Sequence, residues 1–136
     1  MEKTIFQKII AREIPAIIVY EDDRCVAILD ISPINPGHTL VIPRDPYKNI
    51  FELPKELLAH LFSVVQKIAG VQKSALGADG VNIIMNNDAA AGQVVFHAHI
   101  HVIPRYTGDG YEHWHSKRPY NEGEADLIAE KIKNAL

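Results

Sequence analysis

The chain has 136 residues, enough for one domain with its own core and too few for two comfortable domains. Hydrophobic residues make up 47% of the sequence and charged residues 23%, a balance that is typical of globular proteins and excludes a disordered chain. The 14 basic and 17 acidic residues give a net charge of −3, without long runs of either sign. This excludes a DNA- or RNA-binding surface that neutralises many phosphates, although a single phosphate could still be bound locally.

Cys25 is the only cysteine, so neither an intramolecular disulfide nor a CxxC metal site can form. This favours a reducing, cytoplasmic location. The first 15 residues mix charged and apolar side chains, which is not typical of a signal peptide, and no segment has the roughly 20 apolar residues of a membrane span. We therefore expect a cytoplasmic protein without membrane contact.

The N-terminal elements are short. Thr4 is a plausible cap for a helix that ends before Pro15 and carries its apolar residues on one stripe. Residues 16–20 and 25–30 are β-branched runs around a polar turn, which predicts a hairpin. A third strand is predicted over residues 38–43, after a turn rich in proline and glycine.

The remaining elements begin with one long helix over residues 53–76, where apolar side chains recur every three or four residues and Gly77 follows. Strands are predicted from Gly80 and over residues 94–104, with a surface loop over residues 107–120 that could alternatively approach a site. A last helix from about Glu122 is expected to face inward through five residues. These are Ala125, Ile128, Ala129, Ile132 and Leu136. His60, in the long helix, is expected to be exposed.

The order of these elements is not the alternation of a doubly wound sheet. We predict an α+β fold: an antiparallel sheet of about five strands, covered by one long helix and accompanied by short terminal helices. Residues 1–136 would form one domain, with a core over about residues 4–106 and a C-terminal loop and helix over residues 107–136.

Three histidines alternate with apolar residues in the stretch FHAHIHVIP, residues 96–104. Because successive side chains of a strand point to opposite faces, His97, His99 and His101 should share one face. The apolar residues between them can then face the helix layer.

This histidine face has three interpretations. A polar strand face without a task is disfavoured, because three titratable rings in a row would stabilise a sheet poorly. Zinc could bind to alternating imidazoles, but all three rings would have to converge on one ion, and the stretch holds no carboxylate to orient them. The third interpretation is nucleophilic attack on phosphorus by a neutral imidazole, with its neighbours donating to phosphate oxygens. Gly92 and Gln93 suit this one, since glycine lets backbone N–H groups approach an anion.

At these residues the chain resembles the histidine triad (HIT) family, whose signature of three alternating histidines reads His97-Ala98-His99-Ile100-His101-Val102-Ile103 here. GQVVF before the triad and TIFQKII, EIPA, YEDDRCVAILDISP and GHTLVIP in the first 43 residues are similar to its Hint-type branch. The resemblance implies a HIT-like fold, a homodimer, no cofactor, and a nucleotidyl hydrolase or transferase. Its substrates would be purine nucleoside 5′-phosphoramidates or related monophosphate esters, carrying an AMP or GMP unit.

The resemblance also implies roles for individual residues. His99 would attack the α-phosphate and carry the nucleotidyl group, and His101 would contact phosphate oxygens. His97 would support His99 through its backbone carbonyl, and His38 would be a fourth histidine beside the triad. Asp30 would bind the ribose hydroxyls, although it could also simply cap a strand end.

Further residues would surround the nucleotide in such a protein. Asn86 and Gln93 would approach the phosphate and leaving group through their side chains, near the backbone of Gly92 and Val94. An apolar slot for the purine base, formed by residues that are also core candidates, would consist of Ile5, Phe6, Ile9, Ile28, Leu29, Ile31 and Leu40.

The sequence departs from the family at two places. Some bacterial members bind a structural zinc through two cysteines and a histidine, but Thr4, Gln7 and Asp45-Pro46 occupy these positions here. We therefore expect a chain without metal. Val94 occupies a position that is often serine or threonine, so one hydroxyl donor to the substrate is lost. This favours the alternative of a nucleotide-binding or scaffolding protein with slow hydrolysis.

Overall fold

Five strands form one antiparallel sheet in the order β1-β2-β3-β5-β4, which confirms the predicted α+β fold. The computed structural model describes residues 2–112, 114 and 116–136. The elements are α1 (Ile5–Ile10), β1 (Ile18–Glu21), β2 (Cys25–Leu29), β3 (Thr39–Pro43), α2 (Lys55–Leu76), β4 (Gly80–Ile84), the 3-10 turn η1 (Ala89–Ala91), β5 (Ile100–Arg105) and α3 (Glu124–Ala135).

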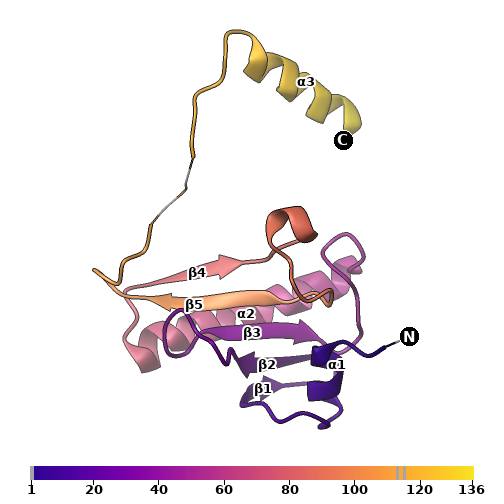
Figure 1. Cartoon of the computed structure of the whole chain (residues 1–136), viewed down its shortest axis with the longest axis vertical. Helices are drawn as coiled ribbons and strands as arrows, with labels where there is room; N and C mark the ends of the chain where they lie inside the picture. Colours follow the sequence, from indigo (N-terminus) through magenta and orange to yellow (C-terminus); the bar gives the residue numbers. More distant parts are fainter. Residues whose placement is uncertain (1, 113, 115) are drawn as a thin grey trace.

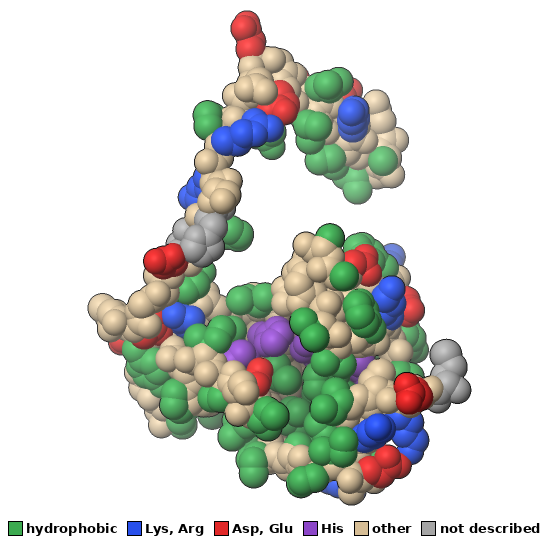
Figure 2. All heavy atoms as spheres, viewed as in Figure 1, with side chains coloured by type: hydrophobic (Ala, Val, Ile, Leu, Met, Phe, Trp, Pro, Cys, Tyr) green, Lys and Arg blue, Asp and Glu red, His purple; other side chains and the backbone are tan. Residues whose placement is uncertain are grey.

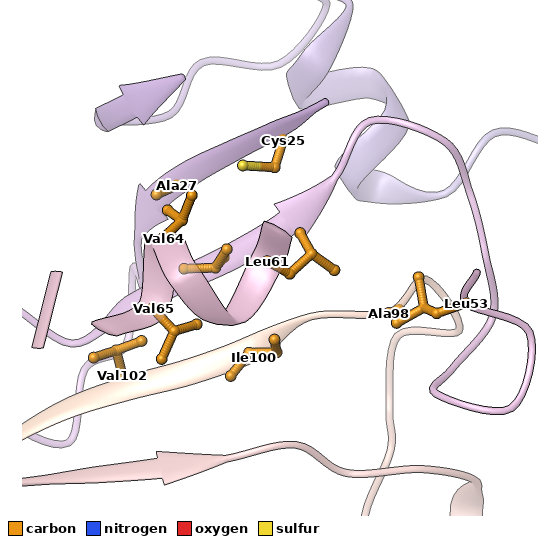
Figure 3. Packing of buried hydrophobic residues seen from close by; sticks show 10 residues of the cluster. Cys25, Ala27, Leu53, Leu61, Val64, Val65, Ala98, Ile100 and Val102 are labelled. Atoms are coloured by element: carbon orange, nitrogen blue, oxygen red, sulfur yellow. The ribbon is translucent and has the colours of Figure 1, made fainter. Parts of the chain in front are cut away.

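Helix α2 covers one face of the sheet (Figure 1). Its buried residues Leu61, Val64 and Val65 pack against apolar side chains from β2, β3 and β5 (Figure 3). Gly77 ends the helix in the left-handed conformation, at φ 68°, which glycine adopts without a steric penalty. The predicted start near Pro54 and end at Gly77 are both confirmed.

Helix α1 lies on the opposite face, over β2 and β3. Thr4 caps it with a capping box, because its hydroxyl accepts the N–H of Gln7 while the Gln7 side chain accepts the N–H of Thr4. The buried side chains Phe6 and Ile9 pack against one face of the strands. The sheet therefore has a separate apolar cluster on each side.

The strand predicted over residues 94–104 begins only at Ile100, so this prediction was wrong for its first half. Residues 95–97 form bends, and the N–H of Ala98 bonds to the carbonyl of Tyr47, 2.7 Å away, outside the strand ladder. Side chains nevertheless alternate between the two faces. Ala98, Ile100 and Val102 all lie in the cluster under α2, as expected.

Helix α3 forms as predicted, but the prediction that one of its faces packs inward was wrong. None of its side chains, all of which the structure describes, is buried. Helix α3 lies apart from the sheet (Figure 1). His113 and His115 of the predicted loop lie outside the described residues. Among the described helices, none has both the length and the apolar content needed to cross a bilayer.

His60 was expected to be exposed, and this was also wrong, since its side chain is only 18% exposed. Its Nε2 lies 2.7 Å from Oδ2 of Asp22, and its Nδ1 lies 2.9 Å from the guanidinium of Arg24. Asp22 also accepts from Tyr20 and from backbone N–H groups, which hold the pKa of its carboxyl well below its usual range. This cluster ties the β1–β2 turn to α2.

Candidate active site

Four histidines meet on the face of the sheet that carries α1, among apolar side chains (Figure 2). His97 and His99 come from the segment before β5, His101 from β5 and His38 from the residue before β3. Ring centroids are 5.1 Å apart between His99 and His101, and 5.2 Å between His38 and His101. The structure therefore brings together the four histidines that the sequence singled out.

His97 is fully buried and both its ring nitrogens have partners. Its Nε2 lies 2.8 Å from the carbonyl oxygen of Pro43, and a carbonyl can only accept, so Nε2 carries the proton. In the neutral ring Nδ1 must then accept, and it does so from the hydroxyl of Thr4 at 2.8 Å. Burial lowers the pKa of His97, which keeps the ring neutral.

His99 has the opposite tautomer. Its Nδ1 donates to the backbone carbonyl of His97 at 2.8 Å, which leaves the lone pair on Nε2. Burial lowers the pKa of His99, and the hydrogen bond to His97 and the charge of Asp30 oppose this only in part. The ring of Phe6 packs edge-on against it at 4.9 Å. A neutral imidazole held in this way can act as a nucleophile through Nε2.

His38 and His101 form a chain of hydrogen bonds. The N–H of Ile34 donates to Nδ1 of His38 at 3.1 Å, so Nε2 of His38 carries the proton and donates to Nδ1 of His101 at 2.9 Å. Nε2 of His101 is consequently an N–H donor. Burial, together with the neighbouring His99 and His38, lowers the pKa of His101 to about 4.

The hydrogen bonds of His38 disfavour a metal site at these histidines. Asp30, His38 and His101 each offer one ligand atom, all within 4.8 Å of one another. His38 would have to bind through Nε2, which holds the ring proton as long as Nδ1 accepts from Ile34. A ligating histidine needs a lone pair on the binding nitrogen, so this tautomer does not suit a metal ligand.

Asp30 lies between a turn and the histidines. One carboxylate oxygen accepts the N–H of Ser32 at 2.9 Å, and the other lies 3.6 Å from Nε2 of His38. One oxygen of Asp30 thus caps the turn, as the alternative interpretation expected, and the other oxygen faces the site. Ile31, next in the chain, is 93% exposed and packs against little of its own protein.

The predicted apolar slot divides between the two faces of the sheet. Phe6, Ile9, Ile28 and Leu40 pack together on the α1 side, close to the histidines, and Ile5 is half-exposed on the same helix. Leu29 does not belong with them. It lines an apolar groove with Ile68 and Gln72 of α2 and Val19 of β1, on the opposite face. Because neighbours in a strand point to opposite faces, Ile28 and Leu29 cannot both line one slot.

Gly92, Asn86 and Val94 lie in or near the loop before the triad. Gly92 has φ 92°, and a Cβ on it would lie 3.8 Å from Nδ2 of Asn86, so the two residues are in contact distance. The Val94 side chain is 84% exposed.

The side chain of Gln93 bonds to the backbone of its own loop and of Lys48. Its oxygen accepts the N–H of Asp88, and its nitrogen donates to the carbonyls of Lys48 and Val95. It is buried and braces the loop through these bonds, and its contact with a phosphate or leaving group stays a prediction.

Some site contacts were missed at the sequence level. The hydroxyl of Thr4 bonds to His97, and the carbonyls of Pro43 and Tyr47 fix the ring of His97 and the peptide that follows it. The TIFQ pattern predicts that Thr4 caps a helix, but the contact joins residues 93 positions apart. Only the packing of α1 onto the sheet brings them together.

The HIT domain family matches residues 11–108 of the chain. An uncharacterised HIT-like protein of Methanocaldococcus jannaschii is 52% identical over 106 residues, which cover 78% of this chain and 81% of that protein. The adenylylsulfatase HINT3 of Arabidopsis thaliana is 46% identical over 105 residues, 77% of this chain and 53% of that protein.

Two crystal structures extend the likeness beyond that matched region. A HIT family protein of Bacillus anthracis has 41% identity and a TM-score of 0.88, covering 99% of this chain and 98% of that one. A histidine triad nucleotide-binding protein of Candida albicans has 30% identity and a TM-score of 0.86, covering 98% and 96%. The matched part thus includes the C-terminal segment and α3.

Proposed function

The chain belongs to the HIT family, and from this premise we propose that it is a cytoplasmic nucleotidyl hydrolase or transferase in which His99 is the nucleophile. The family includes nucleotide-binding proteins and nucleotide hydrolases. The proposed substrate is a purine nucleoside 5′-phosphoramidate or a related monophosphate ester, and the proposed enzyme is a nucleoside phosphoramidase.

The tautomer of His99 is the observation that carries this proposal. Its proton is held on Nδ1 by the carbonyl of His97, so the lone pair of Nε2 is permanently available without a preceding proton transfer. Attack on the α-phosphorus forms an Nε2–P bond as the bond to the leaving group breaks, and the leaving group departs with that electron pair and takes up a proton from water. The ring then becomes cationic, and its hydrogen bond to the carbonyl and the nearby carboxylate of Asp30 stabilise that charge.

The nucleotidyl group would next be transferred from His99 to water, or to another acceptor. During both steps the N–H on Nε2 of His101 can donate to a phosphate oxygen, because its Nδ1 is occupied by His38. The backbone N–H at Val94 lies in the loop before the triad and can add to this, whereas that of Gly92 donates to the carbonyl of Ala89 at 3.0 Å. His101, with a pKa of about 4, is proposed as a neutral donor rather than as a charged acid at pH 7.

The nucleoside would lie between α1 and the end of β2. Phe6, Ile9, Ile28 and Leu40 offer an apolar wall for a purine, extended by the half-exposed Ile5. Asp30 would accept from the ribose hydroxyls through the carboxylate oxygen that faces His38. Ile31 and Asn86 remain proposed contacts at the edge of the site.

The alternative is a purine nucleotide-binding or scaffolding protein with slow hydrolysis. Val94 favours it, because an exposed apolar side chain stands where a hydroxyl could donate to the scissile group. Loss of one such donor could reduce transition-state stabilisation by about 1 to 3 kcal/mol. That is a slower enzyme, and not by itself an inactive one.

A homodimer is part of the proposal. The apolar stripe of α3 has no buried residue, and the edge strand β4 exposes Ile83 next to Phe62 of α2. Amphipathic helices usually gain their stability from burying one face. A second copy of this chain, held between the body and α3, would cover these surfaces.

Quenched single-turnover reaction with a radiolabelled adenosine 5′-phosphoramidate tests the mechanism. The wild-type protein should carry AMP on His99 after peptide mapping, and His99→Ala should carry none while still binding AMP. His60→Gln, a histidine substitution on α2, should label like the wild type. Full wild-type turnover without any adduct would refute the mechanism, and tight binding without wild-type turnover would favour the alternative.

A further inference from the structure

We propose that Thr4 is a positioning residue for His99, acting through His97. The proposal rests on the proposed role of His99 as nucleophile. Thr4 stands at the start of α1, 93 positions from His97 in the sequence, and its hydroxyl bonds directly to the His97 ring. It lies outside the region that matches the HIT domain family.

The direction of this hydrogen bond follows from its neighbours. Nδ1 of His97 can only accept, since Nε2 donates to Pro43. The hydroxyl of Thr4 must therefore donate to His97, and its oxygen accepts the N–H of Gln7 at 3.1 Å. One hydroxyl thus caps α1 and fixes the buried ring at the same time. With Pro43 at the other nitrogen, the ring of His97 is held at both ends.

The fixed ring matters because of the backbone next to it. The carbonyl of His97 accepts a hydrogen bond from the N–H on Nδ1 of His99, which determines where the reactive lone pair lies. This carbonyl belongs to a segment of bends before β5, without the regular ladder of a strand. Its position depends instead on the anchored His97 side chain and on the bond between Ala98 and Tyr47.

Helix α1 makes a second contact that begins at the same place. Phe6 follows Thr4 by two residues and packs edge-on against both rings, 5.7 Å from His97 and 4.9 Å from His99. Loss of the anchor at Thr4 would let the start of α1 and the Phe6 ring shift together. Thr4 does not need to touch the substrate to influence the orientation of the His99 ring.

Three variants separate this role from simple capping. Thr4→Val removes the hydroxyl at nearly constant volume, Thr4→Ser retains it, and Gln7→Ala weakens the capping box while leaving the bond from Thr4 to His97. We expect Thr4→Val to lower kcat about five- to tenfold with little change in KM, the scale of one lost hydrogen bond. Thr4→Ser and Gln7→Ala should retain kcat within about twofold, although Gln7→Ala will unfold more easily.

Nitrogen-15 NMR of the imidazoles gives a readout that does not require turnover. In the wild type His97 should show protonated Nε2 and His99 protonated Nδ1, with slow exchange of the latter with water. In Thr4→Val that exchange should accelerate while the protein stays folded. An unchanged kcat in Thr4→Val, or an equal loss in Gln7→Ala, would overturn the role of Thr4. Turnover retained by His99→Ala would instead overturn the proposed function, whatever the spectra of the Thr4 variants.

Discussion

Acidification should destabilise this protein well above the pH at which its carboxylates titrate, because the fold holds a group of histidines neutral. The pKa of His101 is lowered to about 4 from an ordinary value of 6.5, chiefly by burial. Burial also lowers the pKa of His38, His97 and His99. Unfolding exposes these rings to water, where they bind protons near pH 6.5.

The sign and size follow from proton linkage. Between pH 6.5 and 4 the unfolded chain binds a proton at His101 that the folded chain does not, so stability falls as the pH falls. The slope for one such group approaches about 1.4 kcal/mol per pH unit. His101 alone should therefore cost about 2 kcal/mol between pH 7 and 5, and the other three histidines act in the same direction.

Urea denaturation between pH 7.5 and 5 measures this directly, with His101→Gln as the comparison. The variant should lose about 2 kcal/mol less stability than the wild type over that range. The pKa values of the Asp22 and Asp109 carboxyls are held well below their usual range, so these groups act at lower pH. A flat wild-type profile, or the same slope in His101→Gln, would show that His101 is not held neutral by the fold.

Three further predictions concern the corrected and proposed parts of the structure. Gln93→Leu should lower the free energy of unfolding by about 2 kcal/mol, since it removes the three hydrogen bonds of a buried side chain; thermal and urea denaturation measure this. By calorimetry, Ile28→Ala should weaken AMP binding roughly fivefold, whereas Leu29→Ala, on the opposite face, should leave affinity within about twofold. Ile132→Asp in α3 should shift the protein from dimer to monomer in sedimentation velocity, and a dimer of unchanged affinity would exclude α3 from the interface.

Local sequence patterns predicted most of the fold because helices, turns and hairpins depend largely on residues that are close in sequence. The long helix has an apolar stripe of period 3.6 and a glycine that can end it in the left-handed conformation. The β-branched runs around Asp22 pair as a hairpin, within one or two residues of the expected ends. The three triad histidines could be grouped because the alternation of side chains survives even where the strand does not, whereas His38 was placed beside them by the family resemblance.

The errors arose where long-range contacts override such patterns. Residues 94–99 have strand-like composition, but the hydrogen bonds of Gln93 and the bond from Ala98 to Tyr47 hold them outside the strand ladder. No local pattern predicts the three backbone partners of the Gln93 side chain, one of which lies 45 residues away. The predictions for His60 and α3 failed in opposite ways. The polar side chain of His60 pairs with the half-buried carboxylate of Asp22, whereas no residue of the apolar stripe of α3 is buried against its own chain.

The three triad histidines are chemically identical, yet the structure gives them different capabilities through the nitrogen that each leaves available. His97 leaves neither, since Pro43 and Thr4 occupy both, and it therefore serves as an anchor. His99 uses only its N–H and leaves a lone pair, whereas His101 uses its lone pair and leaves an N–H. Burial lowers the pKa of all three, so charge does not distinguish them at pH 7. In the proposed mechanism the attacking atom and the donor to the phosphate oxygens thus come from one residue type, because two backbone carbonyls, one hydroxyl and one imidazole select the tautomers. A substitution among those partners should then change the chemistry of the site without altering any residue that touches the substrate.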